Sequence, residues 1–279
     1  MALKKSAAAK PTIKKKENPK ILPDVQSEFD TREIAIDKVG VSGISYPVTV
    51  LDRTQKRQKT VAQINMFVDL PKHFRGTHMS RFLEVLNSHR GLITMLNADK
   101  ILKKMIAKFD AKSAHFTMKF QYFIEKSAPV SKIKSLLNYE CEFISSYSDK
   151  LDFVMGVRVP VTTLCPCSKE VSAYGAHNQR SFINIHIRFK EFVWIEDLVA
   201  VAESAASSQI YSLLKRGDEK YVTEYAYKNP RFVEDVVREV AVSLMNDDNV
   251  TWFTVEVINQ ESIHNHDAYA IIRRDKTKL

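Results

Sequence analysis

Two thiols and an imidazole lie close together in the segment PVTTLCPCSKEVSAYGAHNQRS, residues 160–181. Cys165 and Cys167 are separated by one residue, and His177 follows twelve residues after Cys165. Thiolate and imidazole are the preferred ligands of zinc and related transition metals. The segment connects two predicted strands, and long connections in compact domains are often functional. We therefore predict a reaction centre here.

The two cysteines are expected to do different things. We interpret Cys165-Pro166-Cys167 as an extended stretch that directs its thiols to opposite sides, one onto a metal and one toward a substrate. The alternative is that both are small packing residues, as buried free cysteines often are. The polar neighbours Ser168 and Lys169 speak against an apolar setting. Gly175 would permit a tight turn before His177.

Acidic residues and histidines further along the chain are weaker candidates. Glu219 lies in a run of charge, KRGDEKYVTE, whose spacing alone favours a solvated surface. Glu234 begins a predicted helix, where an acid is explained by the helix dipole. The segment from Glu261 to His266 places an acid beside His264, which suits a metal site or a proton relay.

A third group stands in the first half of the chain. The segment GTHMSRF, residues 76–82, opens a predicted helix with Ser80 and Arg81 in its first turn. A hydroxyl, a guanidinium and free backbone N–H groups suit a phosphate. Ordinary N-capping by Thr77 explains the same residues equally well.

Composition excludes several classes of protein. No stretch of about 18 apolar residues predicts a membrane helix, and no secretory signal opens the chain. Three cysteines make a poor disulfide framework, so we expect a reducing, cytoplasmic setting. The sequence has no Walker loop, no GxGxxG and no HExxH.

The net charge of +9 raises the possibility of nucleic-acid binding. Residues 1–20 hold seven lysines against one acid, so six of the nine net charges belong to this tail. A tail rich in Lys, Ala and Pro is typically solvated and disordered. We expect residues 1–22 to be such a tail, and we expect no nucleic-acid or membrane partner.

The predicted elements repeat one order. Strands are expected at 46–51 and 60–70, helices at 79–88 and 97–109, and strands at 114–124 and 140–146. Strands at 151–161 and 182–189, helices at 195–214 and 231–245, and strands at 251–258 and 268–273 follow. This predicts an α+β fold of two tandem ββααββ modules with antiparallel sheets, over residues 23–149 and 150–279. Open sheet edges need pairing or cover, so we also expect oligomers.

Seven segments, taken in order, resemble the prokaryotic type IB GTP cyclohydrolases. They are PDVQS at 23–27, GTHMSRF at 76–82, APVSKIKSLL at 128–137, the segment 160–181, DEKYVTE at 218–224, NPRFVEDVVR at 229–238 and ESIHNHDAY at 261–269. The resemblance implies a tunnelling fold and a homotetramer with active sites at subunit interfaces. It also implies hydrolysis of GTP to 7,8-dihydroneopterin triphosphate and formate, the first step toward folate.

The resemblance also implies roles for individual residues. Cys165, His177 and Glu219 would hold a divalent metal ion (zinc, manganese or iron), against the surface reading of Glu219. Cys167 would be the reactive thiol facing C8 of the purine, and His264 the proton donor. Glu234 would anchor the guanine edge, with Glu261, Arg81 and Ser80 also binding substrate. One departure is Gly217 where the family pattern has proline.

Two other functions remain open on the sequence. A 7-cyano-7-deazaguanine reductase of the same fold would use the thiol without a metal, so His177 and Glu219 speak against it. A nucleic-acid-binding module would lose its function with residues 1–20, and its binding would fall steeply with salt. We expect the shortened chain to keep full turnover instead.

Overall fold

A computed structural model describes residues 23–89 and 97–278, and the predicted basic tail at 1–22 lies outside them. The first half contains β1 (Ile36–Asp52), β2 (Lys56–Leu70), α1 (Met79–Ser88), α2 (Ala98–Phe109), β3 (Ala114–Ser127) and β4 (Lys134–Tyr147). The second half contains β5 (Leu151–Leu164), α3 (Pro166–Val171), β6 (Asn178–Phe189), α4 (Ile195–Ala205), β7 (Ser208–Gln209), α5 (Arg216–Lys228), α6 (Val233–Asn246), β8 (Val250–Gln260) and β9 (Ala268–Asp275). Short 3₁₀ turns lie at Val25–Ser27 and Lys276–Lys278.

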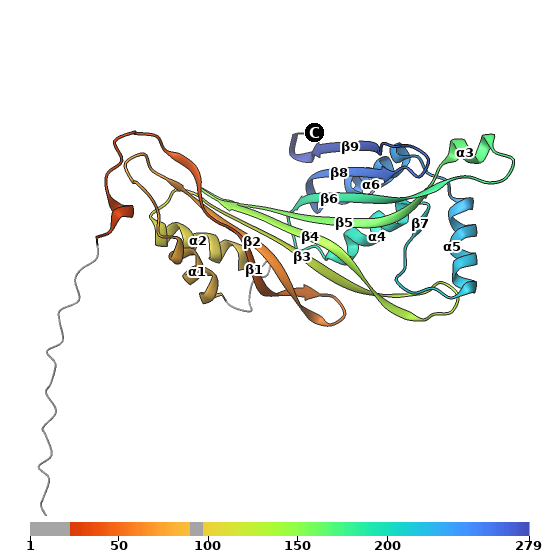
Figure 1. The fold of residues 1–279 in the computed structure, drawn as a ribbon, viewed down its shortest axis with the longest axis horizontal. Coiled ribbons are helices and arrows are strands. Elements are labelled where there is room, and N and C mark those ends of the chain that lie inside the picture. The colour runs from red at the N-terminus through yellow and green to blue at the C-terminus, as the bar shows by residue number, and fades with distance from the viewer. Residues whose placement is uncertain (1–22, 90–96, 279) are drawn as a thin grey trace, which may run out of the picture.

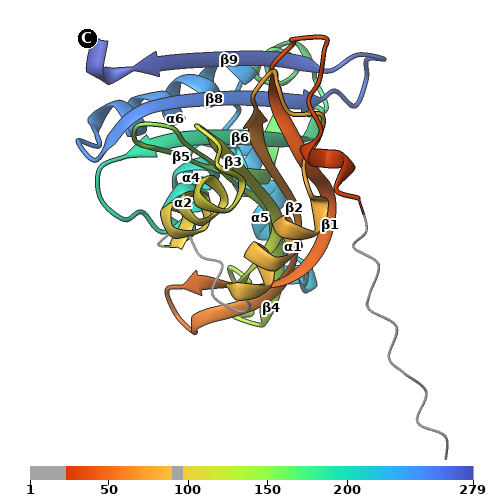
Figure 2. The ribbon, with the colours of Figure 1, turned by 90° about the vertical axis from the view of Figure 1, so that its left-hand side faces the viewer.

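All the strands form one antiparallel sheet in the order β1-β2-β3-β4-β5-β6-β8-β9, with β7 added to β5. Figure 1 shows this sheet running through the whole molecule. Figure 2 shows its strong twist, because β8 and β9 run across the view whereas β1 and β2 stand nearly upright. The α+β class is confirmed, and the first half has the predicted ββααββ order, whereas the second half keeps its four long strands but adds α3, β7 and α5 to the predicted order. The division at residues 149 and 150 stays a prediction, since β4 pairs directly with β5.

Alternating apolar residues build a single core between the sheet and its helices. On β5 the side chains of Val157, Val159 and Val161 are buried, while Arg158 between them points to the other face. The helices α2, α4 and α6 pack on the sheet with their apolar sides inward. The core cluster runs continuously from β1 to β8, so both halves share it.

Strand β1 begins ten residues before the alternating pattern that predicted it. Its register with β2 shifts between Ile36 and Val39 and again between Val41 and Ile44, which hides the alternation. Gly40 is needed at this point, because a Cβ there would stand 2.0 Å from the backbone oxygen of Met66. A search for alternating apolar residues cannot detect a strand whose register shifts in this way.

The predicted helix at 195–214 is wrong in its second part. Helix α4 ends at Ala205, and the chain then joins the sheet as β7. The reason is Ser207, whose Oγ accepts a hydrogen bond of 3.0 Å from the backbone N–H of Leu164, at the end of β5. Most of the charged run KRGDEKYVTE at 215–224, whose spacing alone favoured a solvated surface, lies in helix α5.

A buried ion pair joins α4 to the strands of the first half. Lys126 Nζ lies 2.6 Å from Glu203 Oε1, and the two side chains are 9% and 8% exposed. The same oxygen accepts a hydrogen bond from the hydroxyl of Tyr139, at 2.8 Å. Burial lowers the pKa of Lys126, although the carboxylate of Glu203 opposes this shift. The pair therefore depends on both partners being present.

We expect Lys126→Met to lower the free energy of unfolding by about 3–5 kcal/mol, because it leaves the Glu203 carboxylate buried without a counter-charge. Replacing both residues, as Lys126→Met with Glu203→Leu, should cost less than the single change. Urea unfolding of the three proteins measures this. A double variant less stable than the single one would contradict it.

Within 23–89 and 97–278, no helix has the length and apolarity needed to cross a membrane.

Candidate active site

The segment 165–177 is partly helical, which corrects the sequence interpretation of Cys165-Pro166-Cys167. Cys165 is the N-cap of α3, Pro166 is its first residue, and Cys167 lies in its first turn. Proline suits this position because its fixed φ is helical and its missing N–H is not needed there. The reasoning from an extended chain is wrong for a second reason, since residues two apart on a strand share a face.

The two thiols nevertheless have different surroundings. Cys165 is partly buried, and its Sγ accepts a hydrogen bond from the backbone N–H of Ser168 at 3.4 Å. Cys167 is exposed, and its thiol has no hydrogen-bond partner within the described residues. One thiol is thus held by the protein and the other is accessible. That Cys165 binds a metal and Cys167 faces the substrate stays a prediction. It now rests on the different exposure of the two thiols and no longer on an extended backbone.

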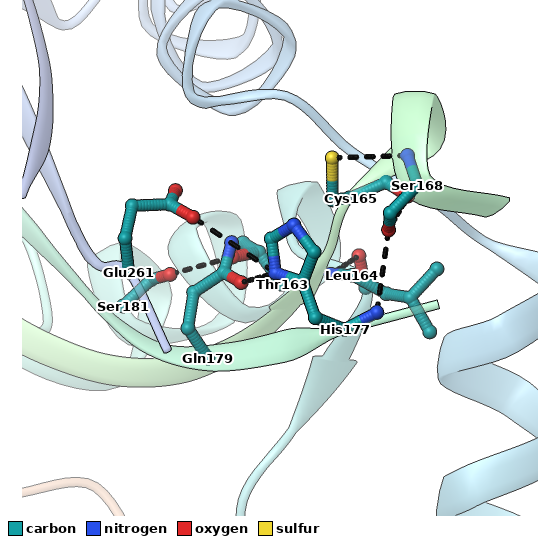
Figure 3. Close-up of polar contacts among 9 residues, drawn as sticks. Thr163, Leu164, Cys165, Ser168, His177, Gln179, Ser181 and Glu261 are labelled. Carbon is teal, nitrogen blue, oxygen red and sulfur yellow. Dashed lines mark hydrogen bonds and ion pairs between the residues drawn. The ribbon is translucent and has the colours of Figure 1, made fainter. Parts of the chain in front are cut away.

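His177 lies directly beside Cys165 at the start of β6. The backbone N–H of Cys165 donates to the carbonyl of His177 at 3.1 Å, and the hydroxyl of Ser168 links the two residues. Gly175, at φ +129°, makes the turn that brings His177 back. The imidazole Nδ1 lies 3.0 Å from Gln179 Oε1 and 3.9 Å from Glu261 Oε2 (Figure 3).

A chain of buried polar side chains stands behind His177. Gln179 Nε2 donates to Thr163 Oγ1 at 3.0 Å, and Thr163 Oγ1 lies 2.7 Å from Ser181 Oγ (Figure 3). The sequence reading missed these three residues. A signal was available, because each occupies a core-facing position of its strand where the alternation calls for an apolar residue.

The β8–β9 connection brings further predicted residues to this place. Glu261 follows the end of β8 directly, and its carboxylate faces His177 with a side chain 13% exposed. His264 and His266 are exposed in the same connection, with ring centroids 5.1 Å apart and nearly parallel planes. The structure therefore gathers Cys165, His177 and Glu261, with His264 in the adjoining loop.

The start of α6 also lies at the end of β5. The backbone N–H of Arg231 donates to the carbonyl of Leu164 at 3.0 Å, one residue before Cys165. The helix is capped by Asp235, whose carboxylate accepts from the backbone N–H of Phe232. Glu234 is exposed and has no hydrogen-bond or ion-pair partner in the described part of the chain. Glu234 lies in the first turn of α6, where its charge suits the helix dipole, and its carboxylate remains available to a ligand.

Glu219 is not assembled with Cys165 and His177 in this chain. It is exposed in the first turn of α5, which is fastened to the β3–β4 turn through Asp218. The Asp218 carboxylate accepts from the backbone N–H groups of Val130 and Ser131. The other end of α5 contacts α3, where Lys169 Nζ donates to the carbonyl of Tyr227. At 1.5 Å per residue, Glu219 lies about 12 Å along the helix from Tyr227.

Ser80 and Arg81 lie far from the cysteines. Both stand in the first turn of α1, whose N-cap His78 makes no side-chain cap. The expected capping by Thr77 is therefore not found. Figure 1 shows α1 and α3 at opposite ends of the long axis of the molecule. These two residues can meet Cys165 only if another copy of the chain supplies them.

The donor set fits a metal ion in part. A partly buried thiol and an adjacent imidazole are suitable ligands for zinc, iron or manganese. Over residues 23–89 and 97–278, no group of three or more His, Cys, Asp and Glu side chains is arranged to hold a metal. The Cys165–His177 pair is accordingly two-thirds of the ligand set that the sequence predicted.

A large cavity among the described residues lies elsewhere. A hollow of about 910 Å³ opens on the face of the sheet away from the helices, and none of the predicted site residues lines it. Some of its polar side chains lie close to one another, as Arg188 to Asp152 and His186 to Glu142. Burial raises the pKa of Glu142, but the His186 hydrogen bond and the nearby Lys119 outweigh burial and lower it.

The fold resembles that of urate oxidases. The uricase from Bacillus fastidious matches with a TM-score of 0.53 and 8% identity, over 88% of this chain and 94% of the uricase. The urate oxidase from Bacillus subtilis 168 matches with a TM-score of 0.51 and 8% identity, over 87% and 100%. At this identity the likeness concerns the fold alone, and it supports the predicted tunnelling fold.

Sequence comparison is far more specific. A family model described as type I GTP cyclohydrolase folE2 matches residues 22–270. The chain is 58% identical to the GTP cyclohydrolase FolE2 of Geobacter metallireducens, over 91% of this chain and 98% of that protein. It is 54% identical to the protein of the same name from Kosmotoga olearia, over 91% and 99%. The chain therefore belongs to the type I GTP cyclohydrolase family of the FolE2 kind.

Proposed function

We propose that this protein hydrolyses GTP to 7,8-dihydroneopterin triphosphate and formate, the first step toward folate. The observation that supports this most directly is the gathering of Cys165, His177, Glu261 and the start of α6 at the ends of β5, β6 and β8. A thiol, an imidazole and carboxylates at one place suit hydrolysis of an electron-poor ring carbon.

Each side chain has a defined task in this proposal. The exposed thiol of Cys167 faces C8 of the purine, and His264 supplies the proton that makes C8 electrophilic by protonating N7. The unpartnered carboxylate of Glu234 accepts two hydrogen bonds from the guanine N1–H and amino group. An adenine edge cannot offer that pair, so adenosine nucleotides would be rejected strongly.

A divalent metal ion, zinc, manganese or iron, is part of the proposal. Cys165 and His177 would hold it, with Glu219 as the third ligand. When bound, such an ion lowers the pKa of a water molecule toward neutrality and so makes hydroxide available. In support of this, the backbones of the two residues are adjacent, because the N–H of Cys165 donates to the carbonyl of His177 and the Ser168 hydroxyl links them.

The activity is tested by incubating the purified protein with GTP and each divalent ion, and following pterin fluorescence and formate release. We expect product with GTP and none with ATP. An absence of product with every ion would overturn the proposal. Consumption of NADPH with a deazaguanine nitrile would instead indicate the reductase of the same fold.

The role of Glu219 needs its own test, because α5 holds it away from His177 in this chain. We expect Glu219→Gln to weaken metal binding at least about tenfold, since a ligand contributes no less than an outer-shell partner. The matched control is Glu224→Gln on the same helix, whose carboxylate pairs with Lys220. Equal metal affinity in the Glu219 variant, the control and the unchanged protein would remove Glu219 from the ligand set.

We also propose that the protein works as a homo-oligomer, a tetramer, with sites between subunits. Among the described strands, β1 and β9 are the edges of the sheet, and open edges favour pairing with another chain. The distance between α1 and α3 supports the same conclusion (Figure 1). Arg81 and Ser80 of one copy would then complete the site of another.

Mixing two inactive variants tests this arrangement. We expect Arg81→Ala and Cys167→Ala proteins, after subunit exchange, to regain part of the GTP turnover, because mixed oligomers contain sites with both residues intact. Each variant exchanged with itself is the control, and sedimentation gives the size of the assembly. A mixture as inactive as its components, or an active monomer, would contradict shared sites.

We place the protein in the cytoplasm, on the support of its three free thiols. No membrane or nucleic-acid partner is part of the proposal.

A further inference from the structure

The two ring nitrogens of His177 have different surroundings. Nδ1 faces two oxygen acceptors, Gln179 Oε1 at 3.0 Å and Glu261 Oε2 at 3.9 Å. Nε2 has no hydrogen-bond partner among residues 23–89 and 97–278. A neutral imidazole carries one proton, and the partner of each nitrogen decides which of the two holds it. The two acceptors that face Nδ1 therefore decide which nitrogen of His177 holds the proton.

A buried hydroxyl anchors the amide of Gln179 through its nitrogen atom. Gln179 is 6% exposed, and Thr163 and Ser181 are fully buried. Because the amide nitrogen donates to Thr163, the amide oxygen is left facing His177 (Figure 3). An amide oxygen only accepts hydrogen bonds, so the proton of the imidazole must be on Nδ1. The Glu261 carboxylate, on the same side, favours the same proton position.

We propose that Gln179 is a positioning residue that holds His177 as the Nδ1–H tautomer, with the lone pair of Nε2 directed away from the sheet. Free histidine in water prefers the opposite tautomer, so the protein has to impose this one. The assignment rests on the two acceptors that face Nδ1, Gln179 Oε1 and the Glu261 carboxylate. Its consequence, that Nε2 is the metal-binding atom, rests on the proposed function.

The neighbouring strands explain why this control is rigid. Thr163 and Gln179 are directly paired residues of β5 and β6, and Ser181 is the next core-facing residue of β6. All three side chains are thus fixed by the ladder rather than by a loop. A ligand supported by the sheet keeps its orientation even when the 261–267 connection moves, and this connection contributes only the longer contact from Glu261.

The tautomer is measured directly by long-range ¹H–¹⁵N spectra of histidine-labelled, metal-free protein at a pH where imidazoles are neutral. His177→Ala identifies the signal among the eight histidines. We expect a pyrrole-type Nδ1 and a pyridine-type Nε2 in the unchanged protein. Gln179→Met, which is close to glutamine in size but is only a weak hydrogen-bond acceptor, should shift the population toward Nε2–H. Gln179→Glu, which still accepts, should retain Nδ1–H.

Metal affinity is measured in parallel by competition with a chelator, using zinc alone as the probe. We expect Gln179→Met to weaken zinc binding about 10–100-fold, the usual effect of losing an outer-shell partner of a histidine ligand, and Gln179→Glu to restore most of it. Gln121→Met is the matched control, since Gln121 accepts a hydrogen bond from Asn138 on the exposed side of β3. Thermal unfolding confirms that each variant is folded.

An Nε2–H tautomer in the unchanged protein would overturn the inference, as would a Gln179→Met protein with the tautomer of the parent. If the tautomer changes as expected but zinc affinity does not, His177 is not a metal ligand. That last result would refute the proposed metal site and leave the role of Gln179 in setting the tautomer intact.

Discussion

Cys167→Ala is expected to lower turnover of GTP by at least about 10²–10⁴-fold, the range associated with losing a group that takes part in the chemical step. The thiol is exposed in the first turn of α3, and the side chain has no hydrogen-bond partner in the described part of the chain. Its removal therefore breaks no hydrogen bond between the described residues. The metal content of the variant should equal that of the unchanged protein, because the thiol of Cys165 remains.

The matched control is Cys141→Ala. Cys141 is buried in β4, 2% exposed, and burial raises the pKa of its thiol so that it stays protonated. We expect this variant to keep its turnover at a temperature where it is folded. Steady-state rates and metal analysis of the two variants test whether the Cys167 thiol takes part in the reaction. Full activity in the Cys167 variant would exclude a chemical role for that thiol, and loss of its metal would make Cys167 a ligand instead.

Cys165→Ala is expected to abolish both metal binding and turnover. Loss of a ligand should weaken metal binding by more than the roughly 10–100-fold that follows loss of an outer-shell partner. Metal-stripped protein should be inactive, and zinc, manganese or iron should restore the parent protein but not the variant. Equilibrium binding and turnover, each measured with every ion under anaerobic conditions, provide the test and identify the preferred metal.

A control for the imidazole partner is available in the same sheet. His177→Ala should behave as Cys165→Ala does, whereas His186→Ala should leave metal affinity unchanged. His186 lies on the helix-free face, where its Nε2 is 3.5 Å from Glu142 Oε2, and it belongs to the wall of the large cavity. A metal-free protein that turns over GTP at the parent rate would remove the metal from the mechanism.

Helices α3 and α6 both contribute a side chain to the candidate site. Both helices begin beside the end of β5, one at Cys165 and the other through the Arg231–Leu164 hydrogen bond. Their first turns carry Cys167 and Glu234, two side chains with no partner in the described part of the chain. A purine held by Glu234 at its pyrimidine edge would thus have its imidazole edge free to face the thiol.

Much of this architecture could be predicted from the residues alone. Apolar positions at period two and at period 3.6 identified most of the strands and helices, because one face of each element has to be buried. The same rule failed for elements that are held in place by polar contacts rather than by a buried apolar face. Helix α5 is fastened through the carboxylate of Asp218 and has only two buried side chains, so it has almost no apolar stripe to detect.

The segment Cys165-Pro166-Cys167 shows the limit most clearly. Its residue types alone pointed to thiol and metal chemistry, and an assumed extended backbone together with the family motif divided the tasks between the two cysteines. Only the tertiary structure showed that the chain turns into a helix at Pro166, and that Ser168 joins Cys165 to His177.

Residue types and their spacing thus determined the fold class, the family and the candidate side chains of this protein, because these depend on local periodicity and motif. The pairing of β5 with β6 decided which residues lie next to the candidate side chains. It sets Thr163 beside Gln179, and it places Cys165 and His177 at the same end of the sheet. Neighbours across a strand ladder are separated by many residues in the chain, so no local pattern could name them.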